Sequence, residues 1–214
     1  MRTEELIGQL SKESAPRQRP ISATTFLATW GAGSAVMVFA AVTAHGMRSD
    51  LQETLGQTRF MLEGLLWMGT SLASALVAYR TAVPGLSWRG YQRHALVWLA
   101  LATAAVLSRV GTENLAGQFF QELGPNRASS CAWAIIGFAS FAGYWVGRSL
   151  RGMAPTRLRL TGFWIAMAQG SLSAFGTQFA CMHDTFAHIF LFHFVPVLVL
   201  VKLGASGGSR LLRW

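Results

Sequence analysis

Residues 26–44 read FLATWGAGSAVMVFAAVTA, a stretch without a single charged side chain. An α-helix needs about 20 apolar residues to cross the roughly 30 Å hydrocarbon core of a bilayer, so this stretch predicts a membrane-spanning helix. Five more segments of similar length and character follow along the chain: 60–79, 91–110, 129–147, 160–181 and 185–203. The sequence therefore predicts six membrane-spanning helices.

The composition of the whole chain agrees with this interpretation. Of its 214 residues, 52% are hydrophobic and 13% are charged, whereas soluble domains carry about 25% charged residues. The six segments use most of the chain and leave no room for a sizeable soluble core. We predict an all-α membrane protein with a cytoplasmic segment at 1–24, a bundle of six transmembrane helices at 25–205 and a basic cytoplasmic tail at 206–214.

The net charge of +9 would suit a nucleic-acid-binding protein, but the distribution of basic residues has another explanation. They gather before the first segment, between the second and third, between the fourth and fifth, and at the C-terminus. The basic residues on the opposite side are Arg48, Arg59, Arg109 and Arg127. Because cytoplasmic loops carry the excess of Lys and Arg, the pattern predicts that both chain ends are cytoplasmic. We expect the lipid bilayer as a partner and no direct contact with nucleic acid.

The opening residues, MRTEELIGQLSKE, predict a short amphipathic helix. Glu4 and Glu5 suit the positive end of its dipole, and Leu6, Ile7 and Leu10 fall on one face. A helix of this length is marginal alone in water, so its apolar face needs a cover. The residues themselves leave two covers open, the membrane surface or a partner protein.

A second feature is the polar cluster in residues 179–194, FACMHDTFAHIFLFHF. Cys181 lies at the outward end of the fifth segment, and Cys131 lies near the outward end of the fourth. Since consecutive spans are antiparallel, we expect the two thiols at similar depth on the outer face. Asp184 and His188 are four residues apart and are predicted to share a helix face. His193 lies deeper in the sixth segment, without a histidine at matched depth in another span, which argues against haem.

Four interpretations of this cluster remain open. The cysteines could form a structural disulfide, or they could be reactive thiols that sense oxidants or metals with help from His183 or His188. A metal site is the third, with Cys131, Cys181 and His183 as weak candidate ligands, because strong ligand spacings are missing. The fourth is incidental polarity where helices meet water.

Enzyme signatures are missing from the sequence. It contains no Gly-rich phosphate loop with its Lys, no HExxH and no GxSxG. We therefore predict a protein that is not an enzyme and needs no cofactor. The alternative is a small multi-pass transporter or a redox-active membrane enzyme that uses the Cys/His residues.

Several segments together resemble one known family. They are MRTEELIGQL at 1–10, FMLEGLLWMGTSLASALVAYRTAVPG at 60–85, Cys131, CMHDTFAHIFLFH at 181–193 and the terminal RLLRW. With these motifs the chain resembles the NrsF-type anti-sigma factors, six-span proteins of the bacterial inner membrane that hold down ECF sigma factors of RNA polymerase.

The resemblance implies a division of labour along the chain. The cytoplasmic N-terminal segment would bind the ECF sigma factor, with contacts from Glu4, Glu5, Leu6, Ile7 and Leu10. The periplasm-facing Cys131 and Cys181 would sense oxidative or heavy-metal stress and cause release of the sigma factor. Five neighbouring residues would support this sensor: Met182, His183, Asp184, His188 and His193.

Overall fold

The structure is a computed structural model that describes residues 3–13, 21–110, 115–123 and 130–213. Every regular element in these ranges is a helix, which confirms the all-α prediction. The elements are α1 (Thr3–Glu13), α2 (Ala23–His45), α3 (Leu51–Leu55), α4 (Thr58–Ala82), α5 (Arg89–Leu107), α6 (Leu115–Glu122), α7 (Ser130–Arg151), α8 (Leu158–Gln178), α9 (Phe186–Ile189), the π-helix η2 (Phe190–Phe194) and α10 (Val195–Leu211).

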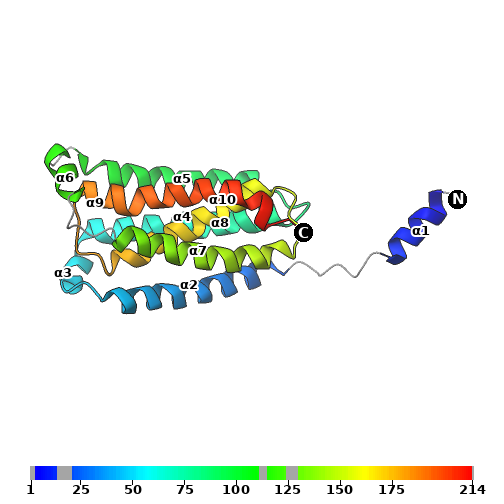
Figure 1. Cartoon of the computed structure of the whole chain (residues 1–214), viewed down its shortest axis with the longest axis horizontal. Helices are drawn as coiled ribbons and strands as arrows, with labels where there is room; N and C mark the ends of the chain where they lie inside the picture. Colours follow the sequence, from blue (N-terminus) through cyan, green and yellow to red (C-terminus); the bar gives the residue numbers. More distant parts are fainter. Residues whose placement is uncertain (1–2, 14–20, 111–114, 124–129, 214) are drawn as a thin grey trace.

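The long helices form an elongated bundle with α8 at its centre. Helix α8 packs against α2, α4, α7 and α10, and its Trp164, Met167 and Ala174 belong to the buried core. Figure 1 shows α3, α6 and α9 gathered at one end of the bundle, while the C-terminus and the start of α2 lie at the other end. Helix α1 stands apart from the bundle beyond that second end.

Four of these helices are long and apolar enough to cross a membrane, whereas the sequence predicted six spans. The four are Ala23–Ala44, Thr58–Ala82, Ser130–Arg151 and Phe186–Leu211. Helices α5 and α8 form at the predicted places but do not reach this apolarity. Helix α5 begins with Arg89 and Arg93, and α8 carries polar residues, such as Thr161 and Gln169, that are buried inside the bundle.

The polar residues of α8 are explained by its central position. Ser71 of α4 donates a hydrogen bond of 2.6 Å to the Ala168 carbonyl of α8, and Thr161 donates one of 3.1 Å to Thr81. A buried polar group is tolerated when it is hydrogen-bonded. A helix that is covered by protein on several sides therefore does not need the continuous apolar surface of a lipid-facing helix.

Glycine residues allow α8 and α10 to approach closely. A Cβ atom at Gly162 of α8 would collide with the carbonyl oxygen of Gly204 and would come within 2.9 Å of the Gly208 Cα, both in α10. Small residues at such crossings let membrane helices pack backbone against backbone. This contact positions α10, which continues directly from α9 and η2, where two residues of the site described next are found.

Candidate functional site

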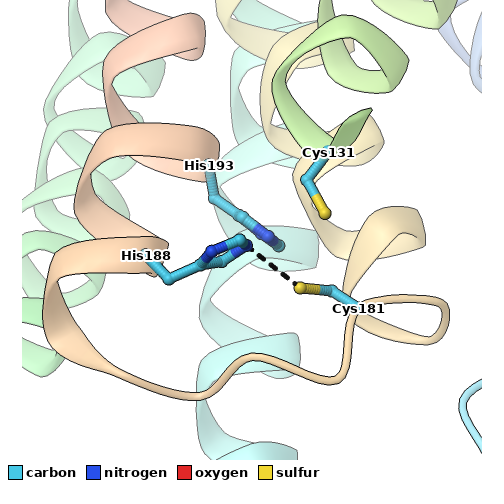
Figure 2. Close-up of side chains that lie close together, drawn as sticks. All are labelled: Cys131, Cys181, His188 and His193. Atoms are coloured by element: carbon cyan, nitrogen blue, oxygen red, sulfur yellow. Dashed lines mark hydrogen bonds between the residues drawn. The ribbon is translucent and has the colours of Figure 1, made fainter. Parts of the chain in front are cut away.

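Four residues from three elements and a loop meet near the end of the bundle that carries α3, α6 and α9 (Figures 1 and 2). Each contributes one sulfur or ring nitrogen, and these atoms all lie within 4.8 Å of one another. The residues are buried, with exposed fractions between 0% and 8%. We call them the Cys/His cluster: Cys131, Cys181, His188 and His193.

The two thiols come from different parts of the chain, one from a helix and one from a loop. Cys131 lies in the first turn of α7, and Cys181 lies in the loop 179–185 that joins α8 to α9. The Cys181 N–H donates to the Thr177 carbonyl at 2.9 Å, which folds the loop back onto the end of α8. The two thiols were expected at similar depth, and the structure brings them close together at one end of the bundle. That this end is the outer face stays a prediction. Both are free thiols rather than a disulfide.

A π-helix brings the two histidines of the cluster together. His188 and His193 are five residues apart, and in an α-helix this spacing would turn them about 140° away from each other. In η2 the chain widens by one residue per turn, and the Val195 N–H donates to the Phe190 carbonyl. Pro196 follows directly and has no N–H to continue α-helical bonding. The rings of His188 and His193 consequently lie 5.8 Å apart.

His188 is held between a thiol and a carboxylate. Its Nε2 lies 3.3 Å from the Cys181 sulfur, and its Nδ1 lies 3.0 Å from Glu122 Oε2. Glu122, at the end of α6, is itself buried and accepts a hydrogen bond of 3.3 Å from the Thr185 hydroxyl. Sequence reasoning did not find Glu122, because a carboxylate in a connecting segment gives no sign that it folds back toward the bundle.

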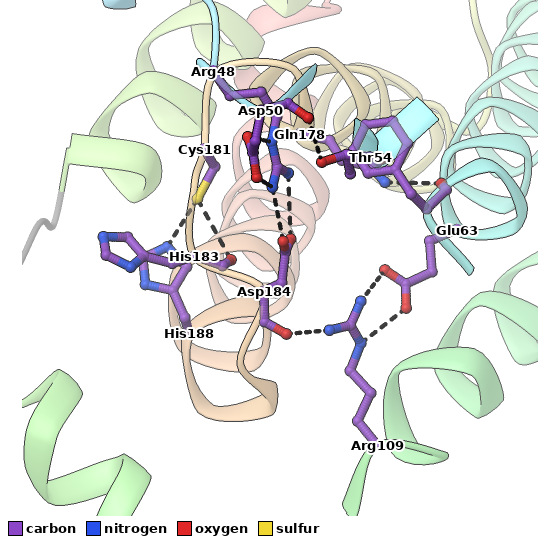
Figure 3. A network of polar contacts seen from close by, with 11 residues as sticks. Arg48, Asp50, Thr54, Glu63, Arg109, Gln178, Cys181, His183, Asp184 and His188 are labelled. Atoms are coloured by element: carbon purple, nitrogen blue, oxygen red, sulfur yellow. Dashed lines mark hydrogen bonds and ion pairs between the residues drawn. The ribbon is translucent and has the colours of Figure 1, made fainter. Parts of the chain in front are cut away.

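The neighbouring residues proposed as sensor support lie in different surroundings. The His183 ring packs 4.7 Å from the His188 ring, whereas Met182 is 58% exposed. Asp184 was predicted to share a helix face with His188, and this is wrong because α9 begins only at Phe186. Asp184 remains in the loop and turns toward Arg48 instead (Figure 3).

Two buried arginines fasten this loop to the bundle. Arg48 donates to Asp50 at 2.7 Å and to Asp184 at 2.8 Å, and its backbone N–H donates to the Phe179 carbonyl at 3.0 Å. The hydrogen bond from Arg48 lowers the pKa of the Asp50 carboxyl to about 2, so this ion pair persists far into the acidic range. The loop that holds Cys181 is thereby tied to the segment that follows α2.

The second arginine joins the loop to α4 and to the end of α5. Arg109 binds both carboxylate oxygens of Glu63, at 2.9 and 2.6 Å, and also donates to the Asp184 carbonyl (Figure 3). Arg109 and Glu63 are both buried. Since a bidentate guanidinium–carboxylate pair is directional, it restricts the position of the loop relative to both helices.

The space beside the cluster is very small. A cavity of about 10 Å³ is lined by Glu63, Trp67, Gln178, Cys181, His183, Asp184, Ile189 and His193. One water molecule needs about 10–15 Å³ by the same measure. An ion or a very small oxidant fits this space, whereas an organic substrate does not. Cys181, His188 and Glu122 form a row of thiol, imidazole and carboxylate, an arrangement that can activate a thiol as a nucleophile. The cavity beside this row has no room for an organic substrate.

The predicted N-terminal helix forms as α1. Leu6 is 40% and Ile7 is 61% exposed, and Glu4 and Glu5 are exposed beside them. Leu10 lies in α1, but its side chain is outside the described part of the chain. The acidic and apolar residues proposed to bind a partner are therefore together on a helix that stands away from the bundle (Figure 1).

Comparison with known proteins gives the family. The sequence model of NrsF, described as negative regulator of sigma F, matches residues 10–214. The chain belongs to the NrsF family. One relative, the anti-sigma-F factor NrsF of Caulobacter vibrioides (strain NA1000 / CB15N), is 28% identical over 217 residues and covers 100% of both chains. No solved structure matches.

The match confirms the resemblance seen in the sequence. The family is described as a negative regulator of sigma F. The family match begins at residue 10, so most of α1 precedes it, whereas the Cys/His cluster lies entirely within it.

Proposed function

We propose that this NrsF-family protein is a membrane-bound anti-sigma factor of the bacterial inner membrane. It sequesters an ECF sigma factor through its N-terminal segment and releases it when Cys131 and Cys181 sense oxidative or heavy-metal stress from the periplasm. The observation that carries the proposal is the position of two features. The buried thiols meet near one end of the bundle, and the amphipathic α1 lies beyond the other end.

The charge distribution supports six crossings with both chain ends in the cytoplasm. Arg148, Arg151 and Arg210 belong to the last turns of α7 and α10, toward the end of the bundle that lies nearer α1. At the opposite end, the described arginines Arg48, Arg59 and Arg109 all form ion pairs with Asp or Glu. The end with α1 thus carries the unbalanced positive charge, as cytoplasmic ends do.

Helix α1 has the character of a segment that binds in a groove. Short amphipathic helices bind partners by placing apolar anchors at helical spacing into a hydrophobic groove. Leu6 and Ile7 provide exposed anchors, Leu10 continues the same face in the sequence, and Glu4 and Glu5 add negative charge. Burial of this face on the sigma factor would stabilise a helix that is too short to be stable alone.

Chemistry at the thiols would act on a two-state equilibrium. A modification shifts such an equilibrium only by the difference in its free energy between the two states. If an oxidant removes two electrons and two protons from Cys131 and Cys181, the disulfide closes a loop of about 50 residues and contributes about 4 kcal/mol by chain entropy. This free energy is enough to make the less populated state of the protein the predominant one, if only that state can form the disulfide.

The contacts of the cysteine loop offer a route to the N-terminal segment. Asp184 and the Phe179 carbonyl bind Arg48, which closely follows α2. Helix α2 runs back along the bundle to the end that lies nearer α1 (Figure 1). A rearrangement of the loop 179–185 would move α2 and, with it, the sigma-binding segment that precedes α2 in the chain.

Co-purification tests the sigma-binding arm. We expect an ECF sigma factor to co-purify with the full chain and to be lost when residues 1–20 are removed, or when Leu6 and Ile7 are both changed to Asp. Gln9→Ala, an exposed position of the same helix, should leave binding unchanged. Binding that survives removal of residues 1–20 contradicts this assignment.

Gene induction tests the thiols. We expect Cys131→Ser and Cys181→Ser to abolish the induction of sigma-dependent genes by an oxidant or by Cd²⁺, since serine neither forms a disulfide nor binds soft metals well. Ser206→Ala, a change at an exposed position of α10, serves as the control. Unchanged induction in both serine variants excludes the thiols as the detector.

A further inference from the structure

We propose that the Cys/His cluster binds one soft divalent cation with a filled d shell, Zn²⁺ or Cd²⁺, with all four of its residues as ligands. Sequence reasoning considered Cys131, Cys181 and His183 as weak ligands, and the structure assigns His188 and His193 in place of His183. Cation binding follows from the cluster alone. Only its effect on a sigma factor rests on the proposed function.

The geometry is close to that of a four-coordinate site. Zinc–sulfur and zinc–nitrogen bonds of about 2.3 and 2.0–2.1 Å place tetrahedral ligand atoms roughly 3.3–3.8 Å apart. In the cluster all four atoms already lie within 4.8 Å of one another, and Cys181 Sγ and His188 Nε2 are 3.3 Å apart. A contraction of about 1 Å, available to side-chain rotation, would complete the coordination sphere.

His193 gives an independent sign of a missing partner. Its Nε2 is buried and has no hydrogen-bond partner among the residues that the structure describes, and the residue is 4% exposed. Leaving a buried polar atom unpaired costs about 1–3 kcal/mol. A cation coordinated by this nitrogen would remove that cost.

The π-helix points to the same conclusion. Wide turns of this kind are rare and occur frequently at functional sites. Here η2 has a specific consequence, because it places His193 beside His188 at a spacing that an α-helix would separate. The local distortion thus completes the set of four ligand atoms (Figure 2).

Glu122 acts as a positioning residue for His188. Metal-binding histidines usually donate their second ring N–H to a carboxylate, which fixes the ring and its tautomer. Glu122 Oε2 lies 3.0 Å from His188 Nδ1, so Nε2, which faces the Cys181 sulfur, is left as the metal-binding nitrogen. The buried carboxylate has this role without touching the cation.

Ligand type and charge select the cation. Two thiolates and two imidazoles favour Zn²⁺ and its relatives over the hard ions Mg²⁺ and Ca²⁺. On binding, each thiol loses its proton, so that M²⁺ and two thiols give an uncharged M(S⁻)₂ unit with two neutral imidazoles and release two protons. A buried site accepts such an uncharged complex more readily than a bare charge.

A second possible group shares His188 but is less suited to this class of cation. It consists of Glu122, His183 and His188. It contains no sulfur, and Glu122 already holds His188 from the Nδ1 side. His183 is half-buried beside His188 without belonging to the cluster, and it therefore offers a matched control.

Cobalt substitution tests the site in the full-length protein in detergent micelles. We expect the reduced protein to bind one Co²⁺ with the visible bands of tetrahedral cobalt and with thiolate-to-cobalt charge-transfer bands. Zn²⁺ and Cd²⁺ should displace Co²⁺ stoichiometrically, and their relative affinities identify the preferred ion. Octahedral cobalt, or no stoichiometric binding by the reduced protein, overturns the proposal.

Variants identify the ligands. Cys131→Ser and Cys181→Ser should each weaken the charge-transfer bands, and His193→Ala should abolish the tetrahedral spectrum, whereas His183→Ala should leave it unchanged. His193→Cys should restore tetrahedral cobalt with stronger charge transfer, because it adds a third thiolate. This gain cannot come from a variant that fails to fold. An unchanged spectrum in His193→Ala contradicts the assignment.

The role of Glu122 is tested by affinity. Loss of a carboxylate that orients a ligand histidine typically weakens metal binding about 10–100-fold. We expect this loss in Glu122→Ala and partial recovery in Glu122→Gln, whose side-chain oxygen still accepts the Nδ1 hydrogen. Equal affinities in Glu122→Ala and the unmodified protein would remove Glu122 from the site.

Failure of this inference is distinguishable from failure of the proposed function. A protein that captures a sigma factor but binds no Co²⁺, Zn²⁺ or Cd²⁺ retains the proposed function and loses the metal site. A protein that binds the cation at the four ligands but captures no sigma factor retains the site and loses the function.

Discussion

Individual buried charges decide how the end of the bundle that carries the Cys/His cluster is held together. Arg109 and Glu63 are both buried and face each other in a bidentate pair. Arg59 reaches the same carboxylate, but its side chain is 46% exposed and its nitrogen lies 3.6 Å away. Removing one partner of a buried pair leaves an uncompensated charge, which costs far more than the loss of an exposed pair.

This contrast predicts the stability of two matched variants. Arg109→Met should lower the free energy of unfolding by about 3–5 kcal/mol, whereas Arg59→Met should lower it by about 0–1 kcal/mol. Thermal or denaturant unfolding in detergent micelles measures both. Adding Glu63→Gln to Arg109→Met should recover part of the loss, since it removes the buried charge. Equal losses in the two single variants would contradict the assignment of Arg109 as the partner of Glu63.

At the scale of elements, the crossing of α8 and α10 determines where the last helix lies. Gly162 and Gly204 face each other so closely that neither has space for a side chain. The same α10 continues from η2, whose geometry positions His193. The close packing of Gly162 against Gly204 therefore helps to fix the position of His193, which lies in η2 directly before α10.

Two glycine-to-alanine substitutions distinguish a glycine that close helix packing requires from a glycine that only lowers helix propensity. Gly162→Ala should destabilise the protein by about 1–3 kcal/mol or more, because its Cβ meets backbone atoms of α10 that cannot turn away. Gly207→Ala meets only the Leu211 side chain at 3.7 Å. It should be neutral or stabilise by up to about 1 kcal/mol, as alanine favours the helix. The melting temperatures of both variants decide between these outcomes.

At the scale of the whole molecule, function depends on which end of the bundle faces which compartment. The proposal places the Cys/His cluster toward the periplasm and α1 in the cytoplasm. Labelling of the native thiols would not test this, because Cys131 and Cys181 are 8% and 5% exposed. Exposed positions at the two ends offer better probes.

Single cysteines should report the orientation. With Cys131 and Cys181 replaced by Ser, Met182→Cys should react with a membrane-impermeant thiol reagent in intact spheroplasts. Ser87→Cys, in the exposed connection between α4 and α5, should react only after the membrane is opened. The reverse pattern would place the cluster in the cytoplasm and exclude sensing from the periplasm.

Most of the long helices could be predicted from the sequence because each of them contains a continuous apolar stretch. The stretch 26–44 becomes part of α2, and 60–79 becomes part of α4. Four helical segments rather than the predicted six are apolar enough to span a membrane. One reason is that α8 mixes apolar residues with buried polar residues such as Thr161, whose hydroxyl donates to Thr81 of α4. A hydropathy scale scores each residue as if it faced lipid, so it cannot account for a hydrogen-bond partner on another helix.

The site divides in the same way. The thiols were expected together because consecutive spans are antiparallel, and this reasoning needs only the order of the segments. Glu122 could not be found, since its position depends on a connecting segment folding back. His193 was named as a supporting residue, but its place beside His188 depends on a π-helix that the sequence did not predict. Asp184 was misplaced because it lies in the loop before α9, which begins only at Phe186.

The helical class, the family and the pair of cysteines follow from composition, motifs and chain order, which the sequence contains directly. The folded bundle was needed to see which imidazoles join the thiols, which carboxylate holds His188 and how the cysteine loop reaches Arg48. Some of these contacts join residues tens of positions apart, such as Glu122 with His188 and Arg48 with Asp184, and others depend on how a loop or a π-helix turns the chain. Their geometry depends on helix ends, one π-turn and close glycine packing, which no local pattern specifies.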